Sequence, residues 1–261
     1  MFAAARQQQI KELLLKHKQI DITTLAATLG VTEVTVRRDL DKLEREGFVN
    51  KTHGGVFLNE GMPDASHETM NEEIPAEIKE IGETAALLVR DREAIFLGSG
   101  VTCLQVAANL KTKQRLTVMT NDLKVAQELS TTAGVISVIT GGNVLPGSSA
   151  LAGELAHRSL ERIHFTKAIL SITGASFTHG FTSGTVEEAL LYKQLFNISD
   201  EVIIVANAMK FGQIGFAFLC QMTDVHKIVT NKELDNQYKE FFFNHNIKIY
   251  TPYEVEEITA L

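Results

Sequence analysis

The sequence predicts an α/β protein in two parts, an N-terminal winged helix-turn-helix module and a larger α/β domain with a mainly parallel sheet. Three observations lead to this fold class. The first 58 residues contain helical patterns separated by a glycine turn and followed by a hairpin pattern. Beyond residue 75, apolar runs of strand length alternate with helical segments, as in sheets covered by helices on both faces. The 261 residues suffice for both parts.

Composition excludes several classes of protein. Apolar residues make up 44% of the chain, yet no run approaches the eighteen or so apolar residues of a membrane span. The charged, helix-periodic N-terminus lacks the apolar segment of a secretory signal. Cys103 and Cys220 lie far apart and outside any CxxC context, which argues against a disulfide framework or a cysteine-based zinc site. We expect a soluble cytoplasmic protein with no membrane partner, metal or cofactor.

The net charge of −7 is unevenly distributed. Residues 1–58 hold nine Lys and Arg against seven Asp and Glu, whereas the remainder holds 16 against 25. A weakly basic head on an acidic body favours nucleic-acid binding by the head. Charged helix surfaces are common, so this observation alone does not decide the function.

The N-terminal pattern predicts helix, turn and helix. A first helix is expected over residues 4–17, an extended segment over 19–22, and a second helix capped by Thr23 or Thr24. Gly30 ends that helix as a left-handed C-terminal glycine does. Thr32 is a suitable N-cap for the third helix, and Glu33 is favourable in its first turn.

The third helix, expected over residues 33–46, has a defined phase. Val36, Leu40 and Leu43 recur at helical spacing and should face the core. The N-terminal end then offers DNA the side chains of Thr32, Glu33, Thr35, Arg37 and Arg38. Arginine forks onto guanine O6 and N7 in the major groove, and threonine reaches phosphates or a thymine methyl. A solvated helix face is the alternative, but the position directly after a glycine turn favours DNA reading.

A hairpin pattern follows the third helix. Gly47 should stop the helix, and residues 48–51 and 56–58 read as two short strands around His53-Gly54-Gly55. A hairpin behind a recognition helix is a wing. Its candidate phosphate contacts are Lys51, Thr52 and His53.

These residues together resemble the winged helix-turn-helix of the DeoR family of bacterial transcriptional repressors. The resemblance rests on a long motif: Thr35-Val36-Arg37-Arg38-Asp39-Leu40, Leu43, Gly47 and His53-Gly54-Gly55, with Arg6 and Ile10 in the opening helix. Thr32 stands where the family often has Ser. The resemblance implies binding to double-stranded operator DNA.

The chain should divide into a DNA-binding domain over residues 3–58, a polar, acidic linker over 59–74 and a sensing domain over 75–261. Pro75 suits the first turn of a helix that continues to Val89. Strands are expected at 94–97, 116–119, 135–139, 168–172, 202–206, 228–229 and 247–250. Helices are expected to end near 110 and 129 and to span about 151–160, 186–196 and 234–245.

Several loops follow the carboxyl ends of predicted strands, where ligands collect in open α/β sheets. The candidate binding residues in them are Gly98, Ser99, Gly100, Thr102, Thr120, Asn121, Gly141, Gly142 and Lys210. Glycines allow backbone N–H groups to approach an anion, the following helix directs its positive end there, and lysine adds a cation. Such glycines are also ordinary punctuation between strands and helices. Their convergence favours a phosphate or sugar-phosphate site.

The body resembles the DeoR-family effector domain, which is related in fold to ribose-5-phosphate isomerase and coenzyme A transferases. The matching segments include Leu151-Ala152-Gly153-Glu154, Gly180-Phe181-Thr182 and Lys210-Phe211-Gly212. The resemblance implies a phosphorylated sugar or polyol effector that releases the repressor from DNA, with Glu154 among its contacts. Many relatives carry Asp where this chain has Gly98 and Asn207. The lactose-operon repressors of the family look nearest, which would link the chain to tagatose 6-phosphate.

The rival interpretation is a sugar-phosphate isomerase or deaminase fused to a DNA-binding head. A general base would then be Glu187, Glu188 or His179. Glutamates on helices are usually solvated, so we expect no catalytic residue. His157 and His164 lack metal-ligand spacing, and the run Phe241–Phe243 suits a core or a subunit interface.

A constitutive architectural DNA binder would not need so large a body. We expect a homodimer or homotetramer, because two winged heads are needed to read spaced half-sites.

Overall fold

The structure is a computed structural model that describes residues 6–7, 9–11, 13–14, 19–45, 49–51, 55–58 and 74–252. The chain divides into two compact units, Met1–Pro63 and Asp64–Leu261, each of which is described by itself. Within the described residues, no helix is long and apolar enough to cross a membrane.

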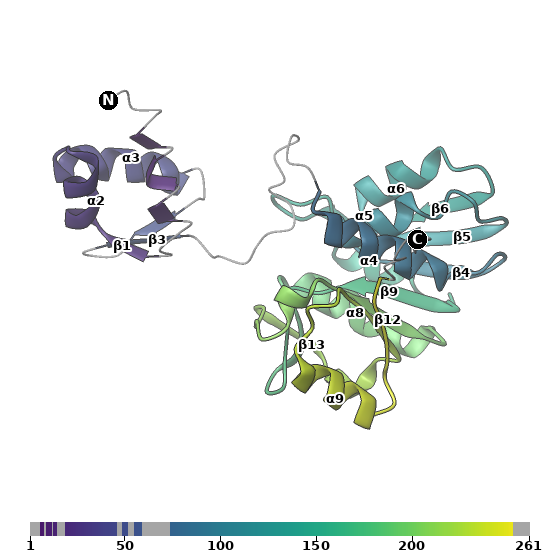
Figure 1. Cartoon of the computed structure of the whole chain (residues 1–261). Helices are drawn as coiled ribbons and strands as arrows, with labels where there is room; N and C mark the ends of the chain where they lie inside the picture. The colour runs from purple at the N-terminus through teal and green to yellow at the C-terminus, as the bar shows by residue number, and fades with distance from the viewer. Residues whose placement is uncertain are drawn as a thin grey trace, which may run out of the picture. The chain divides into compact units, whose positions relative to one another are not determined.

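The N-terminal unit is a helix-turn-helix with a small antiparallel sheet. The described residues between 6 and 14 are helical, and two further helices follow: α2 (Ile22–Leu29) and α3 (Glu33–Arg45). The three strands stand in the order β1-β3-β2: β1 (Gln19–Asp21), β2 (Val49–Lys51) and β3 (Gly55–Leu58). The expected extended segment therefore serves as the third strand of the wing sheet (Figure 1). Apolar side chains from all three helices fill one core.

The turn between α2 and α3 forms as predicted at Gly30, whereas the start of α2 differs from the prediction. Gly30 adopts φ 64°, and its N–H and that of Val31 return to the last carbonyls of α2. The helix begins at Ile22, directly after β1, without a side-chain cap. The prediction that Thr23 or Thr24 caps α2 is wrong, because the chain enters the helix straight from the strand and both residues lie inside it.

The larger unit is built on a parallel sheet of seven strands in the order β15-β14-β12-β9-β4-β5-β6. These strands are β4 (Ala94–Leu97), β5 (Leu116–Thr120), β6 (Val135–Ile139), β9 (Lys167–Ser171), β12 (Val202–Val205), β14 (Lys227–Val229) and β15 (Lys248–Tyr250). All seven predicted strands are thus present. Their apolar residues alternate between two cores, one on each face of the sheet.

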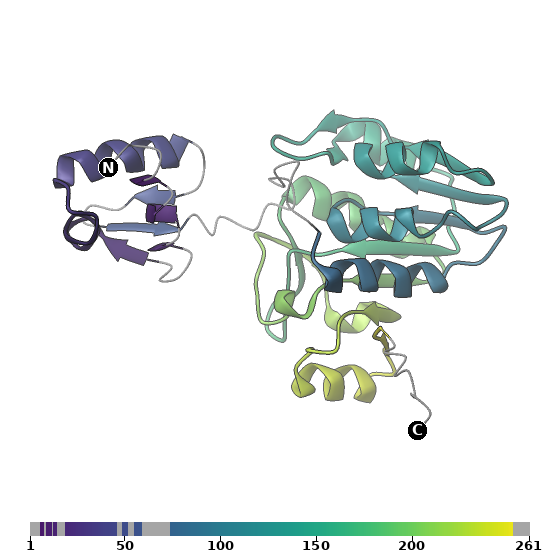
Figure 2. The same cartoon turned by 45° about the horizontal axis from the view of Figure 1, so that its top comes forward.

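Helices cover both faces (Figures 1 and 2). One core joins the sheet to α4 (Ala76–Leu87), α5 (Val101–Ala108) and α6 (Leu123–Ser130). The other joins it to α7 (Glu154–Ser159), α8 (Val186–Ile198) and α9 (Asn236–Asn244). Pro75 is the N-cap of α4 rather than its first helical residue.

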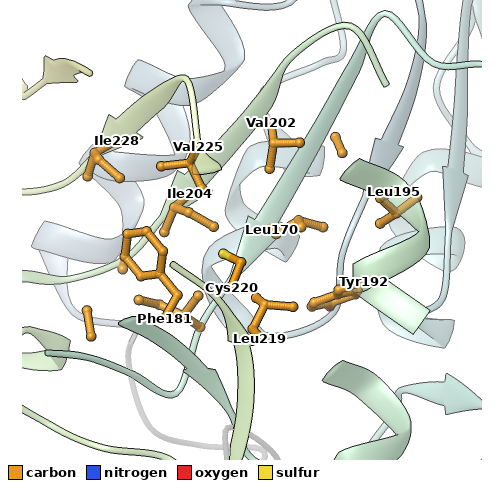
Figure 3. Close-up of a cluster of buried hydrophobic side chains, with 14 of the residues drawn as sticks. Leu170, Phe181, Tyr192, Leu195, Val202, Ile204, Leu219, Cys220, Val225 and Ile228 are labelled. Carbon is orange, nitrogen blue, oxygen red and sulfur yellow. The ribbon is translucent and has the colours of Figure 1, made fainter. Parts of the chain in front are cut away.

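A second, antiparallel sheet was not predicted. It holds β10 (Gly174–Ser176), β11 (Gly180–Ser183) and β13 (Ala217–Cys220) in the order β10-β11-β13. Figure 3 shows Phe181, Leu219 and Cys220 from this sheet against Leu170 and Ile204 of the large sheet. β10 and β11 are fully buried, and the exposed residue of β13 is the apolar Phe218, so the three sequences lack the polar alternation that reveals a half-exposed strand.

The helix expected over residues 151–160 is also corrected. Leu151–Ala152 forms β8, which pairs with β7 (Asn143–Val144), and α7 begins only after Gly153. Gly153 has φ 94°, which is incompatible with a continuous right-handed helix.

Candidate nucleic-acid and ligand-binding sites

The exposed face of α3 has the predicted phase. Val36, Leu40 and Leu43 are fully buried, while Arg37 and Arg38 are exposed. The helix thus presents two adjacent guanidinium groups to solvent on a scaffold fixed by its opposite face.

The start of α3 is held by threonine hydroxyls. The oxygens of Thr32 and Thr35 lie 3.0 Å apart, and the Thr35 N–H donates to Thr32 Oγ1 over 3.4 Å. Glu33 lies 3.8 Å from an Arg37 nitrogen, with both side chains about half exposed. So exposed a pair contributes well under about 1 kcal/mol, so Arg37 is free to engage another anion.

Asp39, in the middle of the motif, points inward and not toward a ligand. Its carboxylate is buried and accepts from Arg6 Nε over 2.5 Å and from Gln7 Nε2 over 3.0 Å. This contact ties the first helix to α3. The motif's Arg6 and Asp39 are therefore one structural pair, a relationship that their spacing of 33 residues did not reveal.

The predicted wing contacts are described only in part. Lys51 lies in β2 opposite Val56 of β3. Thr52 and His53 lie outside the described residues, so their role stays a prediction.

The predicted ligand loops of the larger unit meet at one edge of the parallel sheet. Leu97 pairs with Thr120, and Thr120 pairs with Ile139, so β4, β5 and β6 end side by side. The loops after them, residues 98–100, 121–122 and 140–142, therefore share the carboxyl edge, where open α/β sheets bind ligands.

Asp122 organises two of these loops. Its buried carboxylate accepts from Gly100 N–H over 3.2 Å and from the Ser149 hydroxyl over 2.9 Å. It also caps α6 by accepting from Lys124 and Val125 N–H over 2.8 and 3.2 Å. Four donors thus compensate its charge, which makes it a structural carboxylate that fixes the Gly98–Gly100 loop.

Asn121 and the Gly141–Gly142 turn are joined through β8. The Asn121 amide donates to the Leu151 carbonyl over 3.2 Å, while its Oδ1 is buried without a hydrogen-bond partner. A Cβ on Gly142 would stand 2.5 Å from the Ala152 carbonyl oxygen, and Gly142 has φ 112°. Only glycine fits there, so this glycine is needed for packing against β8.

Ser99 is the centre of a second cluster, which involves α8. Its N–H donates to the Tyr192 hydroxyl over 2.8 Å, and its own hydroxyl donates to Glu188 Oε1 over 2.5 Å. The Ser183 hydroxyl donates to the other oxygen of Glu188. Burial, reinforced by the nearby Glu188 carboxylate, raises the pKa of Tyr192 well above its ordinary value, so this phenol stays neutral.

The first turn of α5 leaves backbone donors available. Gly100 caps this helix with no side-chain hydrogen bond. The N–H groups of Val101, Thr102 and Cys103 have no helical acceptor, because they stand before the first i−4 carbonyl. Such a helix start attracts anions.

Lys210 supplies a cation two strands away. It ends the short 3-10 helix η1 (Ala208–Lys210) after β12, and within the described part of the chain its ammonium has no hydrogen-bond or ion-pair partner. Burial lowers its pKa. β12 and β4 are separated by β9 alone, so their ends lie about 10 Å apart.

Asn207 has a structural task beside Lys210. Its amide donates to Glu77 Oε2 over 2.6 Å, and its Oδ1 caps η1 by accepting from Met209 N–H over 2.8 Å. Asn231 closes this network by accepting from Ala208 N–H over 2.6 Å. An Asp at 207 would face the Glu77 carboxylate, so the neutral amide fits this contact.

Comparison with known sequences identifies both units. The family model described as the DeoR-like helix-turn-helix domain matches residues 6–61, and that of the DeoR C terminal sensor domain matches residues 75–232. The chain belongs to the DeoR family. It is a DNA-binding transcriptional regulator of the helix-turn-helix type.

Relatives of this DeoR-family regulator align along nearly their whole length. YulB of Bacillus subtilis, an HTH-type transcriptional regulator, is 35% identical over 90% of this chain and 91% of its own. The lactose phosphotransferase system repressor of Staphylococcus epidermidis is 28% identical over 90% of this chain and 94% of its own. Among solved structures, a more distant match over about half of each chain is ribose 5-phosphate isomerase A of Methanocaldococcus jannaschii, which is 14% identical, with a TM-score of 0.38 over 51% of this chain and 53% of its own.

The glycine at position 98 is explained by its packing against α8. A Cβ at this position would stand 2.6 Å from the Tyr192 hydroxyl and 3.1 Å from its Cζ. Tyr192 is fully buried and cannot withdraw into solvent. Its hydroxyl fills the space that a side chain at position 98 would need.

Other candidates stand apart from the Ser99 cluster. Glu154 is exposed at the start of α7, and before Gly141 the Thr140 hydroxyl donates to the Gly141 carbonyl while the Thr140 N–H donates to the Thr120 carbonyl. His179 is exposed and pairs with the Thr178 hydroxyl over 2.8 Å. Of the three candidate general bases, Glu187, Glu188 and His179, it is Glu188 whose side chain contacts the loop after β4. The sequence gives no sign of this contact.

Proposed function

We propose that this DeoR-family regulator represses a carbohydrate-utilisation operon and leaves its operator when a phosphorylated sugar or polyol binds the larger unit. The proposal rests on two kinds of group at the same sheet edge: groups that attract an anion, and groups that form hydrogen bonds with hydroxyls. Lys210 and the free amides of α5 suit a phosphate, and Ser99 with Glu188 suits hydroxyls.

The DNA side of the proposal rests on α3. Arg37 and Arg38 are exposed on a helix whose other face is locked in the core. Bidentate arginine contacts to guanine discriminate between bases by about 1–3 kcal/mol each. The repressor names of relatives, including a lactose phosphotransferase system repressor and a putative aga operon repressor, support control of carbohydrate genes.

The effector side of the proposal rests on an unpaired, partly buried cation. A protein seldom buries an ammonium without a counter-charge, because desolvation is costly. An incoming phosphate would pair with Lys210 and remove that cost. A sensor shifts from one conformational state to another only if its effector binds the second state more tightly than the first.

We propose that the site binds its effector without turnover. A general base needs free access to a substrate proton. His179 pairs with the Thr178 hydroxyl, and the relatives that the chain resembles are named as transcriptional regulators. The isomerase or deaminase alternative predicts chemical conversion of a sugar phosphate by the purified chain.

Self-association is part of the proposal, as a dimer or tetramer. Large apolar side chains are exposed on α8, on the adjoining strand β13 and at the residue before that strand: Val186, Leu190, Phe218 and Phe216. Contact between two copies would cover such side chains and place two winged heads on spaced half-sites.

The test begins with operator selection from random duplexes by the full-length chain. Fluorescence anisotropy then measures operator affinity with and without fructose, tagatose and sorbitol 6-phosphates. We expect at least one of them to weaken operator binding tenfold or more, and Lys210→Ala to remain bound in its presence. Failure to select any specific duplex, or release by no sugar phosphate, would contradict the proposal. NMR of the same mixtures detects turnover.

A further inference from the structure

Glu188 occupies an unusual position for a glutamate in the first turn of a helix. Its N–H donates to the N-cap hydroxyl of Thr185 over 3.2 Å, which is ordinary capping. Its side chain does not extend into solvent along the helix. It turns to the loop after β4, where each carboxylate oxygen accepts one serine hydroxyl, from Ser99 and Ser183.

The surroundings of Glu188 hold the carboxylate in one orientation. Ser99 and Ser183 are buried: Ser99 lies in the loop after β4 of the parallel sheet, and Ser183 ends β11 of the antiparallel sheet. Tyr192, one helical turn further along α8, accepts from the Ser99 N–H and touches the Ser99 hydroxyl at 3.1 Å. Because Gly98 leaves room for the phenol, the loop and the helix lock together at this point.

Glu188 nevertheless keeps hydrogen-bonding capacity toward solvent. An ionised carboxylate offers about four acceptor positions, of which the two serines take two. The residue is only partly buried, unlike its serine partners. The remaining positions are acceptors beside a full negative charge, so they suit hydroxyl donors and repel phosphate or carboxylate groups.

We propose that Glu188 determines effector specificity by accepting hydrogen bonds from the uncharged, hydroxyl-bearing end of the effector, with Tyr192 as the positioning residue behind it. The inference rests on the proposed function and adds the effector's class and orientation to it. The effector carries one phosphate, and its other end is a neutral polyol or sugar hydroxyl group. A sugar phosphate with a carboxylate at that end is rejected.

The test compares Glu188→Gln with Glu187→Gln. Both substitutions remove one charge from the same turn of α8, but Glu187 is exposed and makes no contact with Ser99 or Ser183. Isothermal titration measures the Kd of the full-length chain for sorbitol, fructose and tagatose 6-phosphates and for 6-phosphogluconate, which ends in a carboxylate.

We expect the wild-type chain and Glu187→Gln to prefer a neutral-ended probe over 6-phosphogluconate. In Glu188→Gln, affinity for that probe should fall about tenfold or more, since a hydrogen bond to a charged group is lost. Affinity for 6-phosphogluconate should rise, because the new amide donates to its carboxylate. The preference ratio therefore shifts in Glu188→Gln alone.

If Glu188→Gln changes the affinities for the neutral-ended probe and for 6-phosphogluconate by the same factor, the specificity role is overturned. Glu188 would then only hold the loop after β4 against α8. Ser183→Ala separates these cases, because it loosens this contact while keeping the charge, and should leave the preference ratio unchanged. If Glu188→Gln fails to fold, Glu188→Asp replaces it: the shorter carboxylate should weaken the neutral probe and still reject 6-phosphogluconate. A wild-type chain that binds no phosphorylated probe would overturn the proposed function itself.

Discussion

The hydroxyl of Tyr192 stands 2.6 Å from the point at which a Cβ on Gly98 would lie. The same hydroxyl accepts the Ser99 N–H over 2.8 Å. Position 98 and position 192 are therefore coupled: a side chain at the first requires removal of the hydroxyl at the second. The two residues stand far apart in the chain but share one contact in the fold.

Gly98→Ala should lower the free energy of unfolding of the larger unit by about 1–3 kcal/mol, because the new methyl overlaps a fully buried ring. Tyr192→Phe should cost about 1–3 kcal/mol, because the Ser99 N–H loses its acceptor. The double variant should be at least about 0.5 kcal/mol less destabilised than the sum of the two, since removing the hydroxyl relieves the overlap. Urea unfolding of the full chain measures all three.

Tyr250→Phe is the matched control, because the Tyr250 hydroxyl has no hydrogen-bond partner in the described part of the chain. It should be nearly neutral. Strict additivity of Gly98→Ala and Tyr192→Phe would show that the contact does not couple them.

Arg37→Ala and Arg38→Ala should each weaken operator binding about fivefold to 150-fold if the guanidinium reads a base. A variant that loses only a phosphate contact should instead bind all duplexes more weakly by the same factor. The slope of log affinity against log salt concentration should then become shallower by about one. Arg158→Ala, an exposed arginine on α7, serves as the control. Operator affinity is measured by anisotropy over a salt series. Unchanged affinity in both α3 variants would exclude this helix as the reading element.

Asp39→Ala should destabilise the N-terminal unit by about 3–5 kcal/mol, because it removes one member of a largely buried ion pair, the carboxylate that accepts from Arg6 Nε and Gln7 Nε2. Asp200→Ala removes the exposed partner of His164 and should cost less than about 1 kcal/mol. Urea unfolding monitored by far-UV circular dichroism compares the two. Operator binding by Asp39→Ala should recover on cooling if the fold alone is weakened, whereas persistent loss in a folded chain would indicate a direct contact.

Local periodicity was sufficient to predict the helix-turn-helix and the parallel strands. Val36, Leu40 and Leu43 fix the face of α3 by spacing alone, and buried parallel strands appear as apolar runs. The loops of the ligand edge were predictable for a related reason: in a parallel sheet, every strand end that precedes a helix lies on the same side.

Long-range contacts were beyond such reasoning. Glu188 looks like an ordinary helix glutamate, and only the fold brings it to Ser99, 89 residues away. Tyr192 reads as a core residue, and nothing in its neighbours indicates that it replaces a side chain at Gly98. The antiparallel sheet was missed because short, fully buried strands show no alternation.

We expect Lys210 to make effector binding depend on pH. Burial lowers its pKa from the ordinary 10.5, and an effector phosphate would raise it again by pairing with the ammonium. Effector binding above the pKa of the free site therefore takes up a proton, so affinity should fall as pH rises through that pKa. Folding responds in the opposite sense: the unfolded chain binds more protons in this window, so the free energy of unfolding rises with pH toward 10.5.

Lys210→Arg should abolish the decline in affinity, because guanidinium stays protonated throughout this range. Lys210→Met should bind the effector weakly at every pH and lose the alkaline gain in stability. Titration of the effector between pH 7 and pH 10, alongside urea unfolding in the same buffers, measures both effects. An identical pH profile for the wild-type chain and Lys210→Arg would mean that the ammonium of residue 210 does not meet the phosphate.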